Sequence, residues 1–428
     1  MIVQFLSKSR NEFKIFSWVI LFFFLNSFAY AQIPLNLTEA EHLAISSAPE
    51  LKQLQANADS LEEQAIADRQ LSDPQVVVGA INVPTNSFSF SQDEMTMVQV
   101  GLQQSFPAGH SLAMKSKKTK YLAKAERQKI QEQAVMLLRN LRETWLDLYY
   151  WNQAKIIIRE NLLLYGRLVK ATESQYSSGK GTESDVLQLQ VELSRLNDQN
   201  VQVEQRIDIL KAQLGRWIGS ESANRPLSNM LPHWQSPPSM NVLQTRLIQH
   251  PLLKVDTANI EAARNEVAYA KEQYKPAWML DVDYGFRQGT MSDGSPRSNM
   301  VTAQVTVDLP IFPSERQNRR LRASCHQLEA TELDRDVHYK DLLKELRVQY
   351  AIWESFTKRE NLYRQQLMPE AKENSKAALL AYQNATSDLT TVLRAYSNQL
   401  TIRLEQIQIH VERAKARAAL LYLEGMSE

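Results

Sequence analysis

The sequence predicts a mainly α-helical chain with a small transmembrane β part, in which one structural unit occurs twice. The run that begins at Tyr176 returns at Tyr382, about 205 residues later, and a repeat of that length indicates a duplicated unit. The chain has only 12 glycines and is rich in residues that favour long helices. The segment Trp278–Phe286 instead alternates apolar with polar residues, which is typical of a strand.

Residues 1–31 show the order of a secretory signal, in which basic residues precede an apolar stretch, Ile15–Phe28, and small residues follow it. Without this segment the formal net charge of +1 becomes about −1, which argues against a nucleic-acid-binding protein. The single cysteine, Cys325, excludes an internal disulfide. Beyond residue 31 no apolar run is long enough for a membrane-spanning helix, so we expect any crossing to use strands.

The first unit, residues 32–222, is expected to begin with a helix that ends before Asp73-Pro74. Two strands follow, Gln75–Ile81 and one around Val98–Gln103, and then a helix from about residue 110 to 176 that would extend roughly 100 Å. The last helix of the unit carries a coiled-coil seam, whose positions are spaced alternately by four and three residues. Those positions are Leu189, Leu193, Leu196, Asn200, Val203, Ile207, Leu210 and Leu214.

A proline-rich linker, residues 223–240, is expected to cross the outside of the helical part near its equator. The second unit, residues 241–428, repeats the order of the first, with Lys275-Pro276 before a strand pair and Leu309-Pro310 after it. A second coiled-coil seam has nearly the same spacing. Its positions are Leu389, Leu393, Tyr396, Leu400, Leu404, Ile407, Val411, Ala414, Ala418 and Leu421.

The strands of the second unit are about nine residues long, the length that a tilted strand needs to cross a bilayer. Alternation divides the strand side chains between two faces. The face expected to meet lipid includes Trp278, Leu280, Val282, Tyr284, Phe286, Val305 and Val307. The face expected to line a water-filled lumen includes Gln99, Gln103, Asp281, Asp283, Gln304 and Asp308. A strand pair packed on a soluble core would alternate in the same way, so that alternative stays open.

Four strands cannot close a barrel across a bilayer, since small barrels start at about eight strands and an open edge leaves backbone groups without partners. A membrane protein with this sequence must therefore oligomerise. Three copies would supply a 12-stranded β-barrel, with four strands per chain, joined to a long α-helical barrel of near six-fold symmetry.

In this order the motifs resemble the TolC family of outer-membrane efflux proteins, over essentially the whole chain after the signal. The resemblance is carried by the phrases Tyr176–Leu187, Tyr274–Pro276 and Leu309–Phe312. Within the family the sequence is more similar to the branch found with heavy-metal and drug efflux systems. The resemblance implies a homotrimer in outer-membrane lipid of a Gram-negative cell, with its helical tunnel in the periplasm. It further implies docking to a periplasmic adaptor (membrane-fusion) protein and an inner-membrane pump of the RND or ABC type.

The resemblance places the turns of both helical hairpins at the periplasmic tip, where adaptor docking and gating are expected. The first-copy residues are Tyr176, Gly179, Gly181, Thr182, Asp185, Val186 and Leu187. The second-copy residues are Tyr382, Ala385, Asp388, Thr391, Val392, Leu393 and Arg394. In this copy Ala385 replaces the usual glycine, and Thr391 and Arg394 replace carboxylates. We hypothesise that Asp185 pairs with Arg394 across neighbouring helices and holds the entrance shut; capping of a helix by Asp185 is the alternative.

Basic residues follow each strand pair, and three chains would carry six such clusters at the junction of barrel and tunnel. They include Lys115, Lys117 and Lys118 in the first copy and Arg316, Arg319 and Arg320 in the second. Attraction to lipid headgroups, charge lining the lumen and a solvated helix face would each account for them.

The sequence has no recognisable catalytic, metal or phosphate-binding motif, and its seven histidines lack the spacing of metal ligands. No cofactor is therefore expected, and the chain is predicted not to be an enzyme but the passive exit duct of a tripartite efflux system. A type I secretion component and a periplasmic coiled-coil scaffold without a pore are the alternatives. A duct needs the Trp278–Phe286 face in lipid, whereas a scaffold needs it buried against protein.

Overall fold

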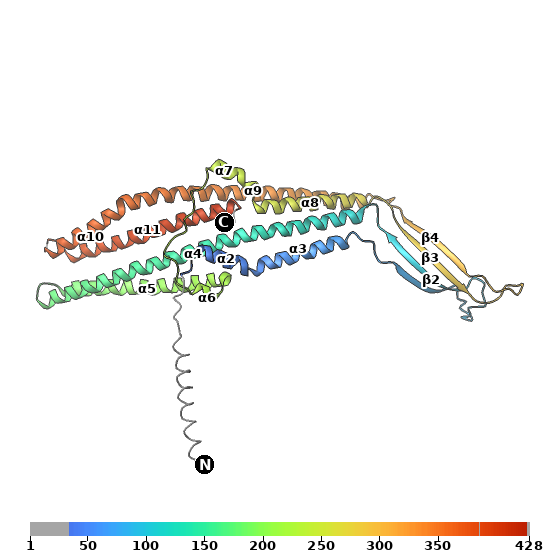
Figure 1. Ribbon diagram of the computed structural model, residues 1–428, viewed down its shortest axis with the longest axis horizontal. Coiled ribbons are helices and arrows are strands. Elements are labelled where there is room, and N and C mark those ends of the chain that lie inside the picture. The colour runs from blue at the N-terminus through green and yellow to red at the C-terminus, as the bar shows by residue number, and fades with distance from the viewer. Residues whose placement is uncertain (1–33, 385, 426–428) are drawn as a thin grey trace, which may run out of the picture.

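A computed structural model describes residues 34–384 and 386–425 and confirms the predicted mainly helical fold with a small sheet. Long helical hairpins reach one end of the molecule, and the four strands lie at the other end (Figure 1). The predicted signal, residues 1–31, and Ala385 at the second hairpin turn lie outside the described residues.

The first unit has two helices where one was predicted before Asp73-Pro74. Pro49 lacks an amide hydrogen and is therefore tolerated only in the first turn of a helix, where it starts the second of the two. The elements are α2 (Leu37–Ser47), α3 (Pro49–Ala67), β1 (Gln75–Ile81), β2 (Met97–Phe106), α4 (Ser111–Ser177), α5 (Glu183–Ile218) and α6 (Ser220–Ala223). With its 67 residues, α4 is about 100 Å long.

The second unit differs from the first in its long helix, which is not continuous. A π-helical turn, η1, interrupts it, and Pro369 follows in the first turn of the next helix. The elements are α7 (Met240–Leu247), α8 (Pro251–Glu272), β3 (Ala277–Arg287), β4 (Met300–Asp308), α9 (Gln317–Leu362), η1 (Tyr363–Leu367), α10 (Met368–Gln383) and α11 (Leu389–Leu423).

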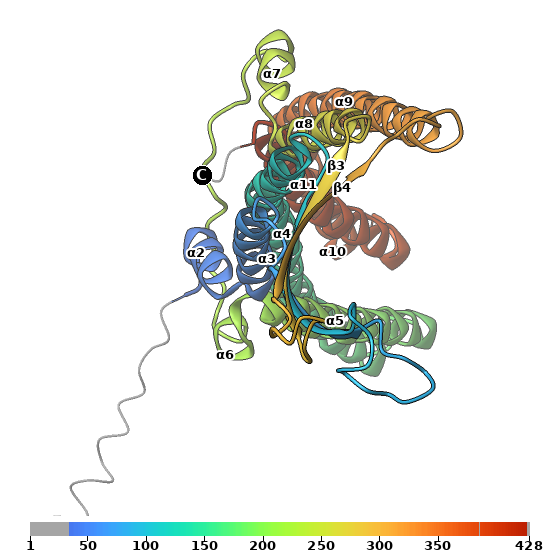
Figure 2. The same cartoon turned by 90° about the vertical axis from the view of Figure 1, so that its right-hand side faces the viewer.

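The helices form one curved layer. Near the strands the contacts run in the order α3, α4, α8 and α9, and toward the hairpin turns they run α5, α4, α11 and α10. Figure 2, seen from the strand end, shows α2, α6 and α7 on the convex side of this layer. The predicted seams are confirmed as its core, because Leu189, Leu196, Leu389 and Leu400 lie in one buried cluster. Among the described helices, none combines the length and hydropathy needed to span a bilayer.

The four strands form one antiparallel sheet in the order β1, β2, β3, β4. The central pair, β2 and β3, joins the two units. In the described chain β1 and β4 each pair on one side only, so the sheet has two open edges.

His250 is a fully buried imidazole that starts α8. Its Nδ1 accepts a hydrogen bond from the Leu252 amide at 3.2 Å, so Nε2 carries the proton and donates to the Tyr422 carbonyl at 3.2 Å. Burial lowers the pKa of His250 from its usual 6.5 to about 4. A second ring proton would lose its water and face the Leu252 amide hydrogen, so the neutral ring is favoured.

This depressed pKa predicts a loss of stability in acid. The stabilisation from neutral His250 is complete above pH 6.5 and disappears as the pH falls toward 4. Acidification from pH 7.5 to 5 should lower the free energy of unfolding by about 2 kcal/mol through this group. His250→Asn keeps a capping acceptor but cannot titrate, so its thermal unfolding should depend less on pH. The same pH dependence in both proteins would contradict this account.

Candidate functional site

The strand register gathers the polar strand residues on one face of the sheet. Gln103 lies opposite Asp281, which in turn lies opposite Gln304, and facing residues of antiparallel strands share a face. By the same register, Gln99, Asp283 and Asp308 belong to this face. The fold therefore brings together the six residues that the sequence assigned to a lumen.

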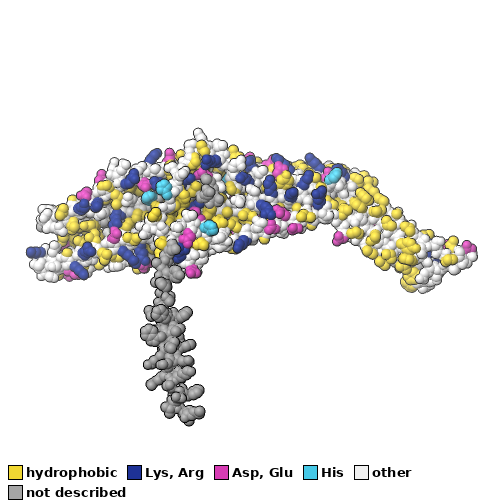
Figure 3. Space-filling view, viewed as in Figure 1, with side chains coloured by type: hydrophobic (Ala, Val, Ile, Leu, Met, Phe, Trp, Pro, Cys, Tyr) yellow, Lys and Arg dark blue, Asp and Glu magenta, His cyan; other side chains and the backbone are white. Residues whose placement is uncertain are grey.

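The opposite face of the sheet is apolar and open. Val282 lies between Leu102 and Ala303 in the register and is 43% exposed. The edge strands are more open still, with Val76 at 68% and Val301 at 69%. Figure 3 shows apolar side chains over the strands, next to a helical surface of mixed charge. No described element of the chain covers this face.

Aromatic pairs stand near both ends of the apolar face. Phe106 stacks on Trp278 at the helical end, with ring centroids 3.9 Å apart. Tyr284 and Phe286 meet edge to face at 4.6 Å near the loop end. The nine residues from Trp278 to Phe286 extend about 26 Å along the strand. A tilted strand of this length suits the apolar band and flanking aromatic girdles of an outer-membrane barrel.

Gly101 makes room for one carboxylate on the polar face. A methyl group at Gly101 would lie 1.8 Å from Asp283 Oδ1. Because Gly101 has no side chain, the Asp283 side chain can lie across the neighbouring strand. The alternating sequence pattern placed Asp283 on the polar face but did not reveal this close approach.

The long loops that follow β1 and β3 are joined by two arginines. Arg297 donates from Nη1 to the Asp93 carbonyl at 2.7 Å, and Arg287 donates from Nη1 to the Glu94 carbonyl at 3.1 Å. These bonds connect the two units beyond the sheet. Sequence analysis missed them because an arginine gives no sign of which backbone carbonyls it will meet.

At the other end of the molecule, the first hairpin turn is closed by a reciprocal cap. Asp185 accepts from the Thr182 hydroxyl at 2.7 Å and donates its amide to the same hydroxyl at 3.2 Å. Gly179 has φ +72°, the left-handed conformation that favours glycine. Within the described chain Asp185 forms no ion pair with Arg394, and its carboxylate caps the start of α5. The pair across neighbouring helices of an oligomer stays a prediction.

The second turn carries the same cap with its two side chains exchanged. Asp388 stands at the N-cap and accepts from the Thr391 amide at 2.8 Å and hydroxyl at 2.7 Å. The hydrogen bonds from Thr391 lower the pKa of Asp388, and Arg394 lowers it further. The two turns are thus more alike than the replacement of a carboxylate by Thr391 in the second copy suggested.

One hydrogen bond joins the two hairpins near their turns. The Tyr382 hydroxyl donates to Gln175 Oε1 at 3.0 Å, from α10 to α4. Tyr382 was among the predicted tip residues, whereas Gln175 was not. Of the other tip residues, Val186, Val392 and Leu393 are buried, while Tyr176 and Leu187 are about half exposed.

The predicted basic junction separates into paired and unpaired side chains. Lys115 binds the buried Asp68 at 3.0 Å, Lys118 binds Glu266 at 2.8 Å, and Arg319 binds Glu315 at 3.0 Å. In the part of the chain that the structure describes, Lys117, Arg316 and Arg320 are exposed and form no ion pair.

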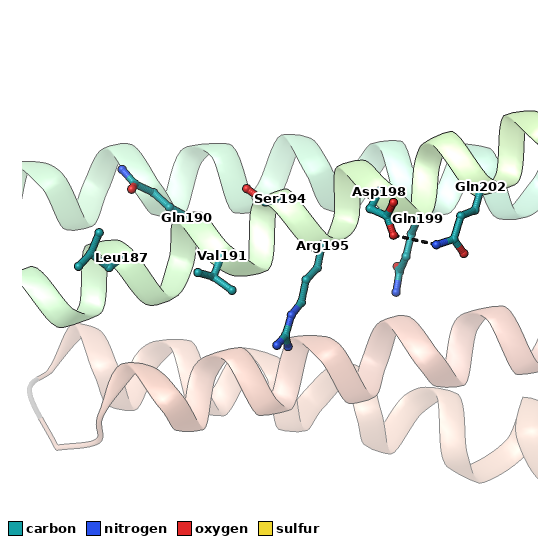
Figure 4. A pocket seen from close by; sticks show the side chains of 8 residues that line it. All are labelled: Leu187, Gln190, Val191, Ser194, Arg195, Asp198, Gln199 and Gln202. Carbon is teal, nitrogen blue, oxygen red and sulfur yellow. Dashed lines mark hydrogen bonds between the residues drawn. The ribbon is translucent and has the colours of Figure 1, made fainter.

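The outer edge of the first hairpin presents a shallow groove of about 880 Å³ along α5. Leu187, Val191 and Arg195 project from the same side of the helix (Figure 4). Leu187 and Val191 are 53% and 52% exposed. This face is turned away from the seam with α4, so it is available to another protein chain.

Within residues 34–384 and 386–425, no three His, Cys, Asp or Glu side chains are grouped so that they could hold a metal ion.

Comparison with known proteins gives the family. The family model "Outer membrane efflux protein" matches residues 41–220 and 242–425. The VceC outer membrane protein of Vibrio cholerae is 16% identical, with a TM-score of 0.77 over 91% of this chain and 96% of that one. A membrane protein from Pseudomonas aeruginosa is 13% identical, with a TM-score of 0.78 over 92% and 91%.

The CmeC outer membrane channel of Campylobacter jejuni is also 13% identical, with a TM-score of 0.76 over 91% of this chain and 85% of that one. No curated protein matched the sequence. These structures share the fold, and the family model spans most of both units. The chain belongs to the outer membrane efflux protein family.

Proposed function

We propose that this protein is the passive exit duct of a tripartite efflux system. Three copies close into a 12-stranded barrel in the outer membrane, and their hairpins form a tunnel through the periplasm. Substrates enter from a periplasmic adaptor and an inner-membrane pump of the RND or ABC type, which supplies the energy. This proposal keeps the predicted division of the chain. A signal, residues 1–31, precedes two units, residues 32–222 and 241–428, which are joined by the linker 223–240.

The observation that carries the proposal is the sheet with one open apolar face and two open edges. Such a sheet is unfavourable in water because its apolar side chains are exposed, and unfavourable in lipid because its edges are unpaired. Pairing β4 of one copy with β1 of the next removes the edges and turns the polar face inward. Asp281, Asp283 and Asp308 would then bias the lumen toward cations.

The helical part supports the same arrangement. The helix α5 is one edge of the curved layer near the turns, and α10 is the other edge. Exposed apolar residues occur on both edges, Val191 on α5 and Leu380 on α10. Contacts between unlike edges give a ring when the rotation closes, as in a threefold oligomer. A type I secretion component would use the same duct with an ABC pump. A coiled-coil scaffold is disfavoured because no described element covers the apolar strand face.

The test is reconstitution of the purified protein. Light scattering in detergent should give a trimer, and planar bilayers should show discrete conductance steps with a preference for cations. A monomer that stays soluble without detergent and gives no conductance would exclude the duct.

We infer that the hydrogen bond between Tyr382 and Gln175 forms in the closed entrance, so Tyr382→Phe should favour the open one. The substitution keeps the ring but removes the hydroxyl that binds Gln175, a bond worth about 1 kcal/mol. We expect the ratio of open to closed channels to rise about fivefold for each broken bond, measured as open probability in planar bilayers. Tyr176→Phe, at the equivalent place in the first copy, removes a hydroxyl on an exposed side chain and should change little. Equal open probabilities in the two variants would show that this bond does not control the entrance.

A further inference from the structure

A basic groove crosses the convex side of the helical layer close to the strands. It has two adjoining parts, of about 750 and 760 Å³, between α3, α4 and α8. Lys117 and Lys120 line both parts. Arg69 lines only the first part, and Lys124 lines only the second. The three lysines follow one another at intervals of three and four residues, so they form one stripe of α4.

Most cations of this groove are not neutralised. Arg127 is bound by Asp59 and Glu62, at 3.0 and 2.6 Å, and these carboxylates are thereby occupied. Glu261 is likewise held by Arg264. Among the described residues, no carboxylate lies within ion-pair distance of the groove residues Arg69, Lys117, Lys120 and Lys124. The groove therefore carries excess positive charge.

The lysine stripe faces outward. Ser116 and Thr119 of α4 contact α3, while Lys118 pairs with α8. Successive side chains of a helix are 100° apart, so the contacts with α3 and with α8 mark two directions around α4. These two directions divide its surface into a smaller and a larger arc. The smaller arc, which includes Leu122, lies on the concave side of a curved layer. The larger arc carries Lys117, Lys120 and Lys124, so these side chains lie on the convex side. Figure 3 shows Lys and Arg side chains, with Asp and Glu among them, over the helices that adjoin the apolar strand surface.

The strand end of the groove adjoins the depth expected for lipid headgroups. The stack of Phe106 on Trp278 marks the helical end of the apolar band. Lys117 is six residues into α4, about 9 Å from its first residue, whereas headgroups extend only about 5 to 8 Å beyond the hydrocarbon. Its backbone therefore lies just beyond the headgroups, and its long side chain, which leans toward the N-terminus of the helix, reaches back to them. Ile66 borders the groove and is 61% exposed, and Leu71 is 45% exposed between the groove and β1. Apolar surface therefore continues from the groove toward the sheet.

We propose that this groove binds the phosphate headgroup of an anionic glycerophospholipid in the periplasmic leaflet of the outer membrane. Arg69, Lys117 and Lys120 contact the phosphate, and the acyl chains pass over Ile66 and Leu71 toward the apolar face of the sheet. Lipid held in this way fixes the depth of the barrel in the membrane. The inference rests on the orientation given under the proposed function, with the helices in the periplasm.

The test is native mass spectrometry of the purified oligomer with added phosphatidylglycerol or phosphatidylcholine. Wild-type protein should retain phosphatidylglycerol in preference to phosphatidylcholine. The triple variant Arg69→Gln, Lys117→Gln and Lys120→Gln should bind it at least about tenfold more weakly. The matched control, Lys52→Gln, Lys170→Gln and Lys180→Gln, removes the same charge from exposed sites on α3, on α4 and at the first turn, and should bind as wild type.

Three results would overturn the proposal. They are equal retention of phosphatidylglycerol by both triple variants, equal retention of the two lipids by the wild type, and displacement of the lipid by millimolar inorganic phosphate, which would mark a site for free anions. Lys117→Gln alone, on an exposed side chain, provides a milder variant should the triple variant not assemble. Conductance of the same preparations in uncharged bilayers separates the two proposals, because a duct without this lipid site would still conduct.

Discussion

Val282→Lys is expected to keep the protein out of the outer membrane. Val282 lies midway along β3 on the open apolar face, between Leu102 and Ala303. A lysine at the midplane of a membrane barrel costs about 2 to 4 kcal/mol. Three chains would multiply that to about 6 to 12 kcal/mol for each trimer, a large part of the net stability of a folded protein. Fractionation and immunodetection of the outer membrane should show little or none of the variant.

Asp281→Lys is the matched control, one residue earlier on the same strand. Its side chain belongs to the polar face, beside Gln103 and Gln304. We expect normal insertion, together with a weaker preference for cations in reversal-potential measurements. Normal levels of both variants would mean that the apolar face does not lie in lipid. Loss of Asp281→Lys with retention of Val282→Lys would show that the two faces are assigned the wrong way round.

Arg142→Ala is expected to be the most damaging change in the helical part. Arg142 is 1% exposed, binds Glu41 of α2 at 2.5 Å and lies over the ring of Trp234 in the linker. Removing one member of a buried ion pair costs about 3 to 5 kcal/mol, because the other charge is left without a partner. The unfolding midpoint in urea should fall accordingly, and the linker should become more sensitive to protease.

Arg347 provides the control, since it occupies the equivalent position in the second unit and is exposed. Arg347→Ala should change the free energy of unfolding by less than about 0.5 kcal/mol. Replacing both charges, with Glu41→Gln and Arg142→Met, should recover part of the loss. Similar midpoints for Arg142→Ala and Arg347→Ala would show that the buried pair does not stabilise the fold.

The strands and helices could be predicted from the sequence because each repeats one periodicity over many residues. The helical pattern from Leu189 to Leu214 and the strand pattern from Trp278 to Phe286 can be recognised without knowing which elements pack against them. The break at Pro49 and the π-helical turn were not predicted, because they depend on how backbone hydrogen bonds rearrange around single residues.

The same distinction between local pattern and tertiary contact separates the site residues that could be predicted from those that could not. Face assignments need only alternation, so the polar row of Gln103, Asp281 and Gln304 could be predicted. Hydrogen-bond partners depend on which helices pack together in the tertiary structure, so the bond between Gln175 and Tyr382 could not be predicted. Asp185 was ambiguous because a carboxylate three residues into a helix can serve either its own backbone or a neighbouring cation.

The π-helical turn η1 also records how the two units diverged. Arg347 follows Arg142 by 205 positions, but Tyr382 follows Tyr176 by 206. One residue was therefore gained in the second copy, or lost from the first, between these landmarks, and η1 lies in that interval. A π-turn closes its hydrogen-bonded ring with one more residue than an α-turn, so it absorbs an insertion without rotating the seam beyond it. Deleting Gln365 should thus remove the π-turn and return the seam of the second unit to the phase of the first, while Pro369 still leaves one backbone carbonyl without an intrahelical partner.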